Sequence, residues 1–97
     1  MRAGALFHQK FYLEGQRYVV EMEVLQVNDR ARFPDGVKYG LICLDRKTGA
    51  KVLMDNHHPK GHHQYVGEAE APYEYRGLDQ LIEDFRQLVN SEMGVNL

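Results

Sequence analysis

The fold is decided by residues 16–27, which read QRYVVEMEVLQV. Every second position of this run is apolar: Tyr18, Val20, Met22 and Val24. Successive side chains of a β-strand point to opposite faces, so the pattern predicts a strand with one buried and one solvated face. Residues 5–13 mix aromatic and polar positions as a strand would, and Glu14-Gly15 predicts a two-residue turn between the runs. The two runs are therefore expected to form a β-hairpin.

Further strands follow along the chain. A polar loop closed by Pro34-Asp35-Gly36, a strong turn signal, leads into residues 37–45, which are apolar enough on both faces for a central strand. A second turn precedes a short strand over residues 50–54, and residues 73–75 alternate like a short edge strand. We therefore predict an antiparallel β-meander of about four strands.

The apolar period changes between Leu78 and Met93. Here the apolar residues repeat at intervals of three and four: Leu78, Leu81, Ile82, Phe85, Leu88 and Val89. This period predicts an amphipathic helix, and Gly94 follows where a C-cap glycine is common. Strands followed by a helix are typical of α+β proteins. We expect a single domain over residues 1–97, with one C-terminal helix packed on a face of the sheet.

Composition narrows the class of protein. The chain is 43% hydrophobic and 27% charged, which is typical of a globular protein and excludes a disordered or fibrous one. Its formal net charge of −2 argues against an electrostatic grip of the whole surface on nucleic acid. Cys43 is the single cysteine and lies in an apolar run, which predicts a buried, inert thiol. Without a membrane-spanning run or a secretory segment, we expect a cytoplasmic protein.

The strongest functional signal is residues 55–65, DNHHPKGHHQY, which hold four of the five histidines. Pro59 and Gly61 exclude a helix in this segment. Residues 58–61 fit a type I turn, with proline second and glycine fourth, and such a turn brings its ends to within about 7 Å. We expect it to fold the first pair of histidines back against the second pair.

Clustered imidazoles beside a lysine favour acid–base chemistry on RNA without a metal. Such cleavage needs a base for the 2′-hydroxyl proton, an acid for the departing 5′ oxygen and a cation for the phosphorane charge. Histidine titrates closest to neutral pH, so one histidine from each pair can serve as acid or base. A lysine supplies the cation and an aspartate orients an imidazole. The predicted catalytic residues are His57, His58, His62, His63, Lys60 and Asp55.

Three residues that follow the cluster are predicted to bind the RNA. A tyrosine ring stacks on an unpaired base, which suits Tyr65 and Tyr73. Arg76 is placed to meet phosphate charge. No cofactor is predicted, and no residue is assigned to a metal.

Two alternatives stay open. Neutral imidazoles are good ligands for zinc, nickel or copper, and the histidines with Asp55 supply enough donor atoms for a metal site. Alternatively, the segment is a polar surface turn without chemistry. Without chemistry at these residues the chain would be a non-enzymatic protein-interaction or metal-binding module, whereas a catalytic metal would make it a metal-dependent hydrolase.

Five short motifs carry a resemblance to a known family: VKY at 37–39, MDNH at 54–57, GHH at 61–63, PY at 72–73 and LIEDF at 81–85. Together they resemble the TumE-type family of small bacterial and archaeal proteins, which is assigned to toxin–antitoxin systems as the toxin. The likeness spans nearly the whole chain. It implies a helix-turn-helix antitoxin as partner and toxicity directed at RNA. Independently, the edge strand of so small a sheet predicts a homodimer.

Overall fold

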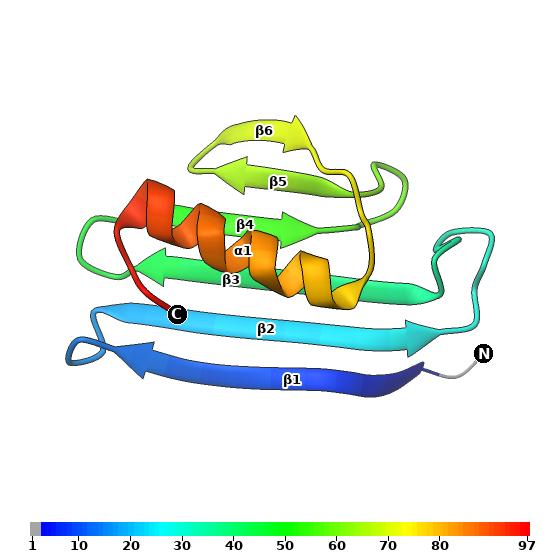
Figure 1. Ribbon diagram of the computed structural model, residues 1–97, viewed down its shortest axis with the longest axis horizontal. Helices are drawn as coiled ribbons and strands as arrows, with labels where there is room; N and C mark the ends of the chain where they lie inside the picture. The colour runs from blue at the N-terminus through cyan, green and yellow to red at the C-terminus, as the bar shows by residue number, and fades with distance from the viewer. Residues whose placement is uncertain (1–2) are drawn as a thin grey trace.

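The computed structural model describes residues 3–97 as one six-stranded antiparallel sheet with a helix on one face (Figure 1). The strands lie side by side in chain order. The elements are β1 Ala3–Leu13, β2 Tyr18–Val27, β3 Val37–Asp45, β4 Lys51–Asp55, β5 His63–Val66, β6 Ala69–Pro72 and α1 Leu78–Met93. The predicted α+β meander with one C-terminal helix is thus confirmed in its architecture.

The predicted number of about four strands is wrong, because six are present. β5 and β6 have four residues each. β5 shows no apolar alternation, and the alternation of alanine and glutamate in β6 is too short and too weakly apolar to indicate a strand. Pairing of β5 with β4, and of β6 with β5, holds them in the sheet instead. Residues 73–75, predicted as an edge strand, lie outside the strands, so β6 forms that edge.

The predicted hairpin of β1 and β2 is confirmed, but its loop has four residues and not two. Residues 14–17 form the turn, and the Arg17 N–H donates to the carbonyl oxygen of Glu14 at 3.2 Å. The Arg17 guanidinium binds both carboxylate oxygens of buried Asp45, at 3.1 and 2.9 Å. These bonds hold the pKa of Asp45 well below its usual range. The side chain of Arg17 therefore fixes this end of the hairpin to the end of β3.

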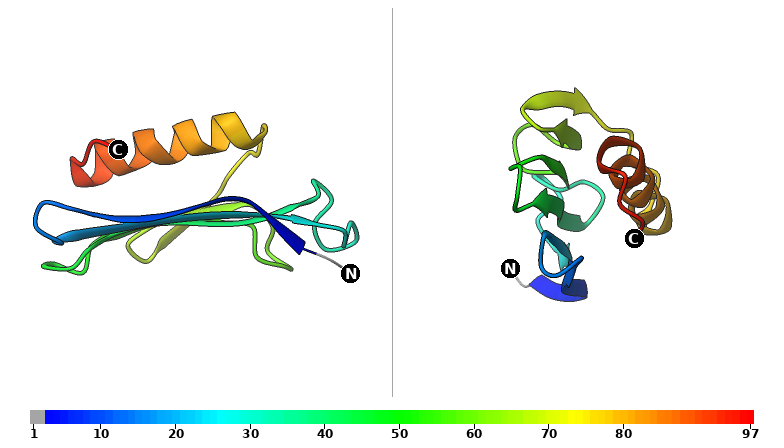
Figure 2. Two further views of the ribbon diagram at one scale, coloured as in Figure 1. Left: turned by 90° about the horizontal axis from the view of Figure 1, so that it is seen from below. Right: turned by 90° about the vertical axis from the view of Figure 1, so that its left-hand side faces the viewer.

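The core lies between α1 and the face of the sheet that it covers, here called the inner face; the opposite side is the outer face (Figure 2). The apolar positions predicted for β2 all point inward and are buried: Tyr18, Val20, Met22 and Val24. Leu81, Phe85 and Val89 of the helix are fully buried against the same core. Burial raises the pKa of the Cys43 thiol to about 11, which confirms a buried and unreactive cysteine.

The helix ends as its sequence predicts. Gly94 follows Met93 with φ 68°, in the left-handed conformation, and its N–H donates to the Asn90 carbonyl oxygen. Glycine suits this C-cap because it lacks the Cβ atom that disfavours positive φ. In the described part of the chain no helix has the length and apolar character needed to cross a membrane.

Candidate functional site

The histidine segment joins β4 to β5 by a turn that differs from the predicted type I turn. The carbonyl oxygen of His57 accepts a hydrogen bond from the Gly61 N–H at 3.1 Å, so the turn spans five residues. The hydrogen bond of a type I turn over residues 58–61 would instead join the Gly61 N–H to the carbonyl oxygen of His58. The type I prediction is therefore wrong, although the chain does reverse here and delivers His63 to β5.

The four imidazoles do not meet in one pocket. His57 and His58 are exposed, and their rings make no hydrogen bond or ion pair with residues 3–97. His63 is the first residue of β5 and His62 immediately precedes it, and their side chains lie on opposite faces of the sheet. His62 contacts Tyr39 on the inner face, whereas His63 lies beside Glu70 on the outer face.

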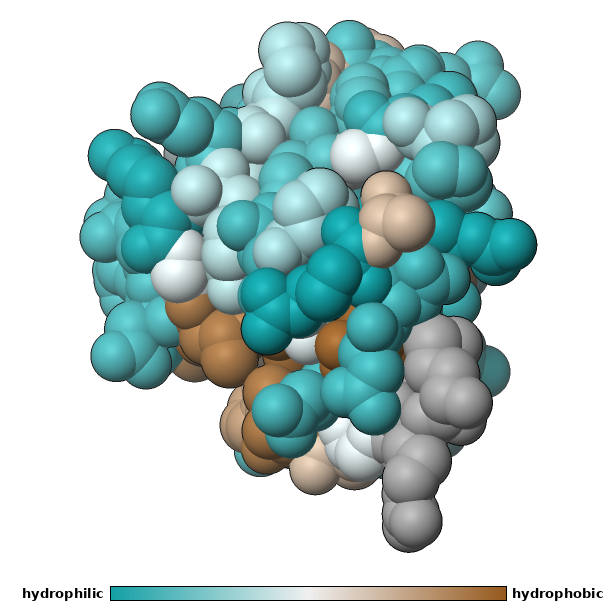
Figure 3. All heavy atoms as spheres, turned by 90° about the vertical axis from the view of Figure 1, so that its right-hand side faces the viewer, coloured by the Kyte–Doolittle hydropathy of each residue, from teal (hydrophilic) through white to brown (hydrophobic). Residues whose placement is uncertain are grey.

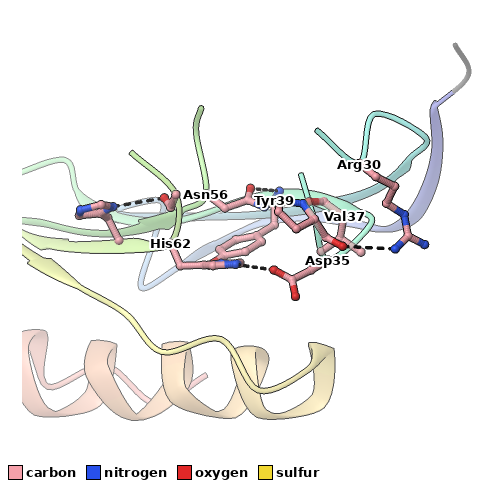
Figure 4. A network of polar contacts seen from close by, with 9 residues as sticks. Arg30, Asp35, Val37, Tyr39, Asn56 and His62 are labelled. Carbon is pink, nitrogen blue, oxygen red and sulfur yellow. Dashed lines mark hydrogen bonds and ion pairs between the residues drawn. The ribbon is translucent and has the colours of Figure 1, made fainter. Parts of the chain in front are cut away.

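On the inner face His62 is held between an acid and a phenol. Its Nε2 lies 2.8 Å from Oδ2 of Asp35, and its Nδ1 lies 2.9 Å from the Tyr39 hydroxyl (Figure 4). Its ring also stacks on Tyr75, with 4.7 Å between ring centroids and planes 5° apart. We call Asp35, Tyr39, His62 and Tyr75, together with the adjoining Asn56, the inner-face network.

Tyr39 and Asp35 hold His62 from two sides. Burial raises the pKa of Tyr39 far above its ordinary value, so this hydroxyl stays protonated at Nδ1 of His62. The Asp35 carboxylate lies within hydrogen-bond distance of Nε2 on the opposite side of the ring. Both ring nitrogens of His62 are therefore occupied by protein groups.

Asn56 ties this network to the sheet. Its Oδ1 accepts the backbone N–H of Tyr39 at 2.9 Å, and its Nδ2 donates to the carbonyl oxygen of Val37 at 2.7 Å. The side chain is 4% exposed, so both bonds are shielded from water. Asn56 thus continues the pairing of β3 and β4 beyond the last backbone hydrogen bonds, which matches the side-chain-to-backbone bonding typical of asparagine in turns.

A cleft of about 180 Å³ opens beside the network. The side chains of the loop before β3 form one wall, and Asn56, Gly61 and His62 form the other. Figure 3 views the end of the molecule that carries these loops, and its upper part is mostly hydrophilic. Arg32 is the cation of this cleft and also pairs with Asp29 at 3.5 Å.

On the outer face three side chains converge on the carboxylate of Glu70. Both Glu70 carboxylate oxygens accept from Nζ of Lys60, at 3.2 and 3.1 Å. The Tyr65 hydroxyl donates to Oε2 of Glu70 at 3.1 Å, and Nε2 of His63 lies 3.6 Å from the same oxygen. We call Lys60, His63, Tyr65 and Glu70 the outer-face cluster.

Charge and accessibility distinguish this cluster from the inner-face network. The hydrogen bonds from Lys60 lower the pKa of Glu70, and those same contacts raise the pKa of Lys60. The Lys60 side chain is 57% exposed and that of Glu70 33% exposed, so both groups are open to a ligand. The His63 ring also contacts the Gly61 carbonyl oxygen through Nδ1, at 3.2 Å. An imidazolium at this position directs one N–H to Gly61 and the other toward Glu70.

Two further residues belong beside the outer-face cluster. Asp55 faces His63 across the β4–β5 ladder, which places both side chains on the same face of the sheet. Glu70 itself was not among the predicted site residues. It is opposite Tyr65 in the β5–β6 ladder, and only the pairing of two strands that the sequence does not signal brings it there.

The remaining predicted residues, Tyr73 and Arg76, lie in a different cleft. The Tyr73 hydroxyl donates to Asp84 at 2.6 Å, and the Arg76 guanidinium lies 3.5 Å from the same carboxylate. Burial raises the pKa of Tyr73, and the bond to Asp84 adds to the shift. The cleft holds about 440 Å³ between the inner face of β5 and α1, with Gln64 on the strand side.

Within residues 3–97 no group of three or more histidine, cysteine, aspartate or glutamate side chains is arranged to hold a metal ion. The described geometry therefore gives no support to the metal-binding alternative. In the outer-face cluster the nearest approach to a ligand set is His63 with Glu70, and Lys60 occupies both oxygens of that carboxylate.

Comparison with known proteins identifies the family. The family model described as toxin TumE matches residues 4–93 of the 97-residue chain. No curated protein and no solved structure matches it. The match begins in β1 and ends at the last residue of α1, so it covers the sheet, both histidine environments and the helix. The chain belongs to the TumE family and is the toxin component of a toxin–antitoxin system, with an antitoxin as its partner.

Proposed function

We propose that this toxin cleaves RNA without a metal and that the reaction takes place at the outer-face cluster. The observation that supports the proposal is the convergence of Lys60, His63 and Tyr65 on Glu70 at an accessible surface. Lys60 supplies a cation and His63 an imidazole close to one another, and these are two of the groups that cleavage of RNA requires.

The reaction proposed is an internal transfer. A base removes the proton of the 2′-hydroxyl, the 2′ oxygen bonds to phosphorus, and the bond from phosphorus to the 5′ oxygen breaks. An acid then protonates the departing 5′ oxygen. The products are a 2′,3′-cyclic phosphate and a 5′-hydroxyl, and no oxidant or second substrate is needed.

His63 is the proposed acid, because its Nε2 points into the cluster and lies 3.6 Å from Oε2 of Glu70. Lys60 stabilises the charge on the phosphorane, and Asp55 orients His63 from the neighbouring strand. His57 or His58, exposed on the loop that leads to β5, supplies the base.

His62 has a different place in the proposal. Both its ring nitrogens are bonded to protein groups. Its proposed role is therefore to hold the conformation of the loop that carries His57 and His58. Tyr65 offers its ring to a base next to the scissile bond. Tyr73 and Arg76 contact the RNA after it has passed over β6. This edge strand separates their cleft from the outer face.

The test is cleavage of end-labelled single-stranded RNA in the presence of EDTA, with control variants that change the same residue types elsewhere on the surface. Glu70→Gln and Lys60→Ala are compared with Glu68→Gln and Lys51→Ala. Both control residues are exposed, and their side chains make no hydrogen bond or ion pair within residues 3–97. We expect wild type and controls to give cyclic phosphate ends, and the cluster variants to lose most activity.

Equal cleavage by Lys60→Ala and Lys51→Ala would contradict the outer-face cluster as the site. Loss of all cleavage on chelation, restored by a divalent metal, would contradict metal independence. Absence of cleavage by wild-type protein that still arrests growth would leave the alternative of a non-enzymatic interaction module.

We also propose a helix-turn-helix antitoxin as the partner, the cytoplasm as the place of action and a homodimer as the assembly. RNA is plentiful in the cytoplasm, and the unpaired, buried Cys43 suits a reducing compartment. The open edge of the sheet at β1 supports self-association.

A further inference from the structure

The two edges of the sheet differ in a way that points to a partner. β6 is four residues long and ends in proline, and both features blunt an edge. β1 is eleven residues long and contains no proline. Within the described residues, the exposed large hydrophobic side chains are Leu6, Phe7 and Tyr12, and all three belong to β1. Edge strands that are long and apolar pair with other strands unless something protects them.

The sequence of β1 is nearly symmetric about its centre. Residues 5–13 read ALFHQKFYL, so Gln9 is flanked on each side by a basic residue, an aromatic residue and an apolar residue. The ladder with β2 is regular from Phe7 to Leu13, whereas a bulge interrupts it between Ala5 and Phe7. The symmetric pattern over residues 7–11 therefore lies on regular, extended backbone with one edge free.

We propose that a second copy of this chain pairs antiparallel with β1, with Gln9 of the two copies facing each other across a two-fold axis. In this register Phe7 lies opposite Phe11 of the partner subunit, and His8 lies opposite Lys10 of the partner subunit. Directly opposite residues of an antiparallel pair share a face, so the phenylalanines form two aromatic pairs on the inner face. The two sheets become one sheet of twelve strands, with closed two-fold symmetry.

The surface around β1 fits this occupant. Two cavities of about 400 and 350 Å³ lie along the inner side of β1, with Phe7 lining both and Ile82 and Arg86 of α1 forming the opposite wall. Figure 3 shows hydrophobic residues gathered in its lower part, on the β1 side. The two-fold axis brings these cavities of the two copies side by side. The aromatic side chains of one copy therefore border the cavities of the other copy.

Charge is compatible with self-pairing. The basic residues of β1, His8 and Lys10, face Glu23 and Glu21 of β2 in the ladder. Nε2 of His8 lies 3.0 Å from Oε2 of Glu21. Each copy thus brings two glutamates and two basic residues to the outer face beside the proposed interface. Where His8 lies opposite Lys10 of the partner subunit, the glutamates of the two β2 strands flank the pair.

The inference names the surface of the homodimer proposed above and does not depend on RNA cleavage. Its first test is the mass of the purified toxin in sedimentation equilibrium at micromolar concentration. We expect twice the mass of the chain for wild type. Phe7→Glu places a carboxylate opposite Phe11 of the partner subunit and should weaken association by about 100-fold or more. The matched control Glu68→Gln, near the β6 edge, should remain dimeric.

A second test reads the register directly and does not depend on the folding of Phe7→Glu. Opposite Cα atoms of an antiparallel pair are about 4.5–5.5 Å apart, within the range of a disulfide. Gln9→Cys should therefore cross-link to its own copy on mild oxidation, whereas His8→Cys and Lys10→Cys should cross-link only when combined in one chain. Cys43 is fully buried and serves as the unreactive background.

A single-chain mass for wild type at every concentration would overturn the proposal. Cross-linking of His8→Cys alone as readily as Gln9→Cys would overturn the register. RNA cleavage is measured separately, so a monomeric but active toxin, or a dimeric but inactive one, assigns the failure to one proposal and not the other.

Discussion

His62 and His63 are neighbours in sequence and have opposite environments. His62 is bonded through both ring nitrogens and stacked on Tyr75, and its side chain is 21% exposed. His63 is similarly covered, at 20% exposed, but lies beside accessible charged groups. Similar exposure therefore does not mean a similar role. What differs is whether the partners of the imidazole are themselves open to a ligand.

The same division applies to Asp55 and Asn56, which precede the turn of the histidine segment. Asn56 is buried and bonds to the backbone of β3, whereas Asp55 lies across the ladder from His63 on the outer face. Alternation along an extended chain sends each of these pairs to the two sides of one sheet. The comparison shows that the inner-face side chains bond to the protein itself, whereas the outer-face side chains stay accessible to a ligand. Under the proposed function the inner face supplies stability and the outer face the chemistry, and four predictions test that division.

The largest expected effect is on activity at the outer face. His63→Ala should lower the rate of RNA cleavage by about a thousandfold, because a positioned acid contributes roughly 10²–10⁴ in rate. Its free energy of unfolding should stay close to that of wild type. Single-turnover cleavage and urea unfolding of the same preparation measure both quantities. A large loss of stability with unchanged rate would erase the distinction between the faces.

The next effect is on stability at the inner face. Asn56→Ala leaves the Tyr39 N–H and the Val37 carbonyl oxygen buried without their partner, which should cost about 3 kcal/mol of unfolding free energy. Cleavage should persist at temperatures where the variant is folded. Urea denaturation gives the stability, with the exposed Glu68→Gln as a control. A loss below about 0.5 kcal/mol would show that the turn does not depend on this side chain.

A smaller effect is expected for His62→Phe. The aromatic stack with Tyr75 is kept, but the buried Tyr39 hydroxyl loses its hydrogen-bond partner, which should cost about 2 kcal/mol. The rate of RNA cleavage should fall only to the extent that the loop before β5 loses its fixed conformation. If His62→Phe instead abolishes cleavage without destabilising the fold, the inner-face imidazole takes part in the reaction and the assignment of roles is reversed.

The smallest effect concerns pH. Lys60 lowers the pKa of Glu70 in the folded state, so this pair stabilises the protein above about pH 4.5 and the contribution is lost as the pH falls through the folded pKa. Glu70→Gln should remove that part of the pH dependence while changing stability at pH 7 only slightly, because the pair is exposed. Unfolding curves of both proteins between neutral and acidic pH provide the measurement.

Elements whose pattern reflects burial on one side were predictable. The alternation in β2 and the helical period of α1 are direct consequences of facing a core, and both were placed correctly together with the Gly94 cap. β5 and β6 were not, because they are short, half-exposed or exposed, and stabilised by pairing with β4 and with each other.

Part of the candidate site was predictable for a similar reason. Lys60, His63, Tyr65 and Asp55 were named from residue type, and the fold does bring them to one face. Glu70 was missed because only the ladder between β5 and β6 places it opposite Tyr65. The prediction that all four imidazoles lie together is wrong, because the consecutive residues His62 and His63 take opposite faces of the sheet.

The sequence by itself determined the α+β class, the first hairpin, the buried thiol, the helix with its cap and the segment in which function is sought. These follow from residue type and period, which act over a few neighbouring residues. Only the tertiary structure decided which histidine joins which partners, since Asp35 and Tyr39 reach His62 from the loop before β3 and from β3 itself. That choice depends on strand order and on the face each side chain takes, and no local pattern encodes either.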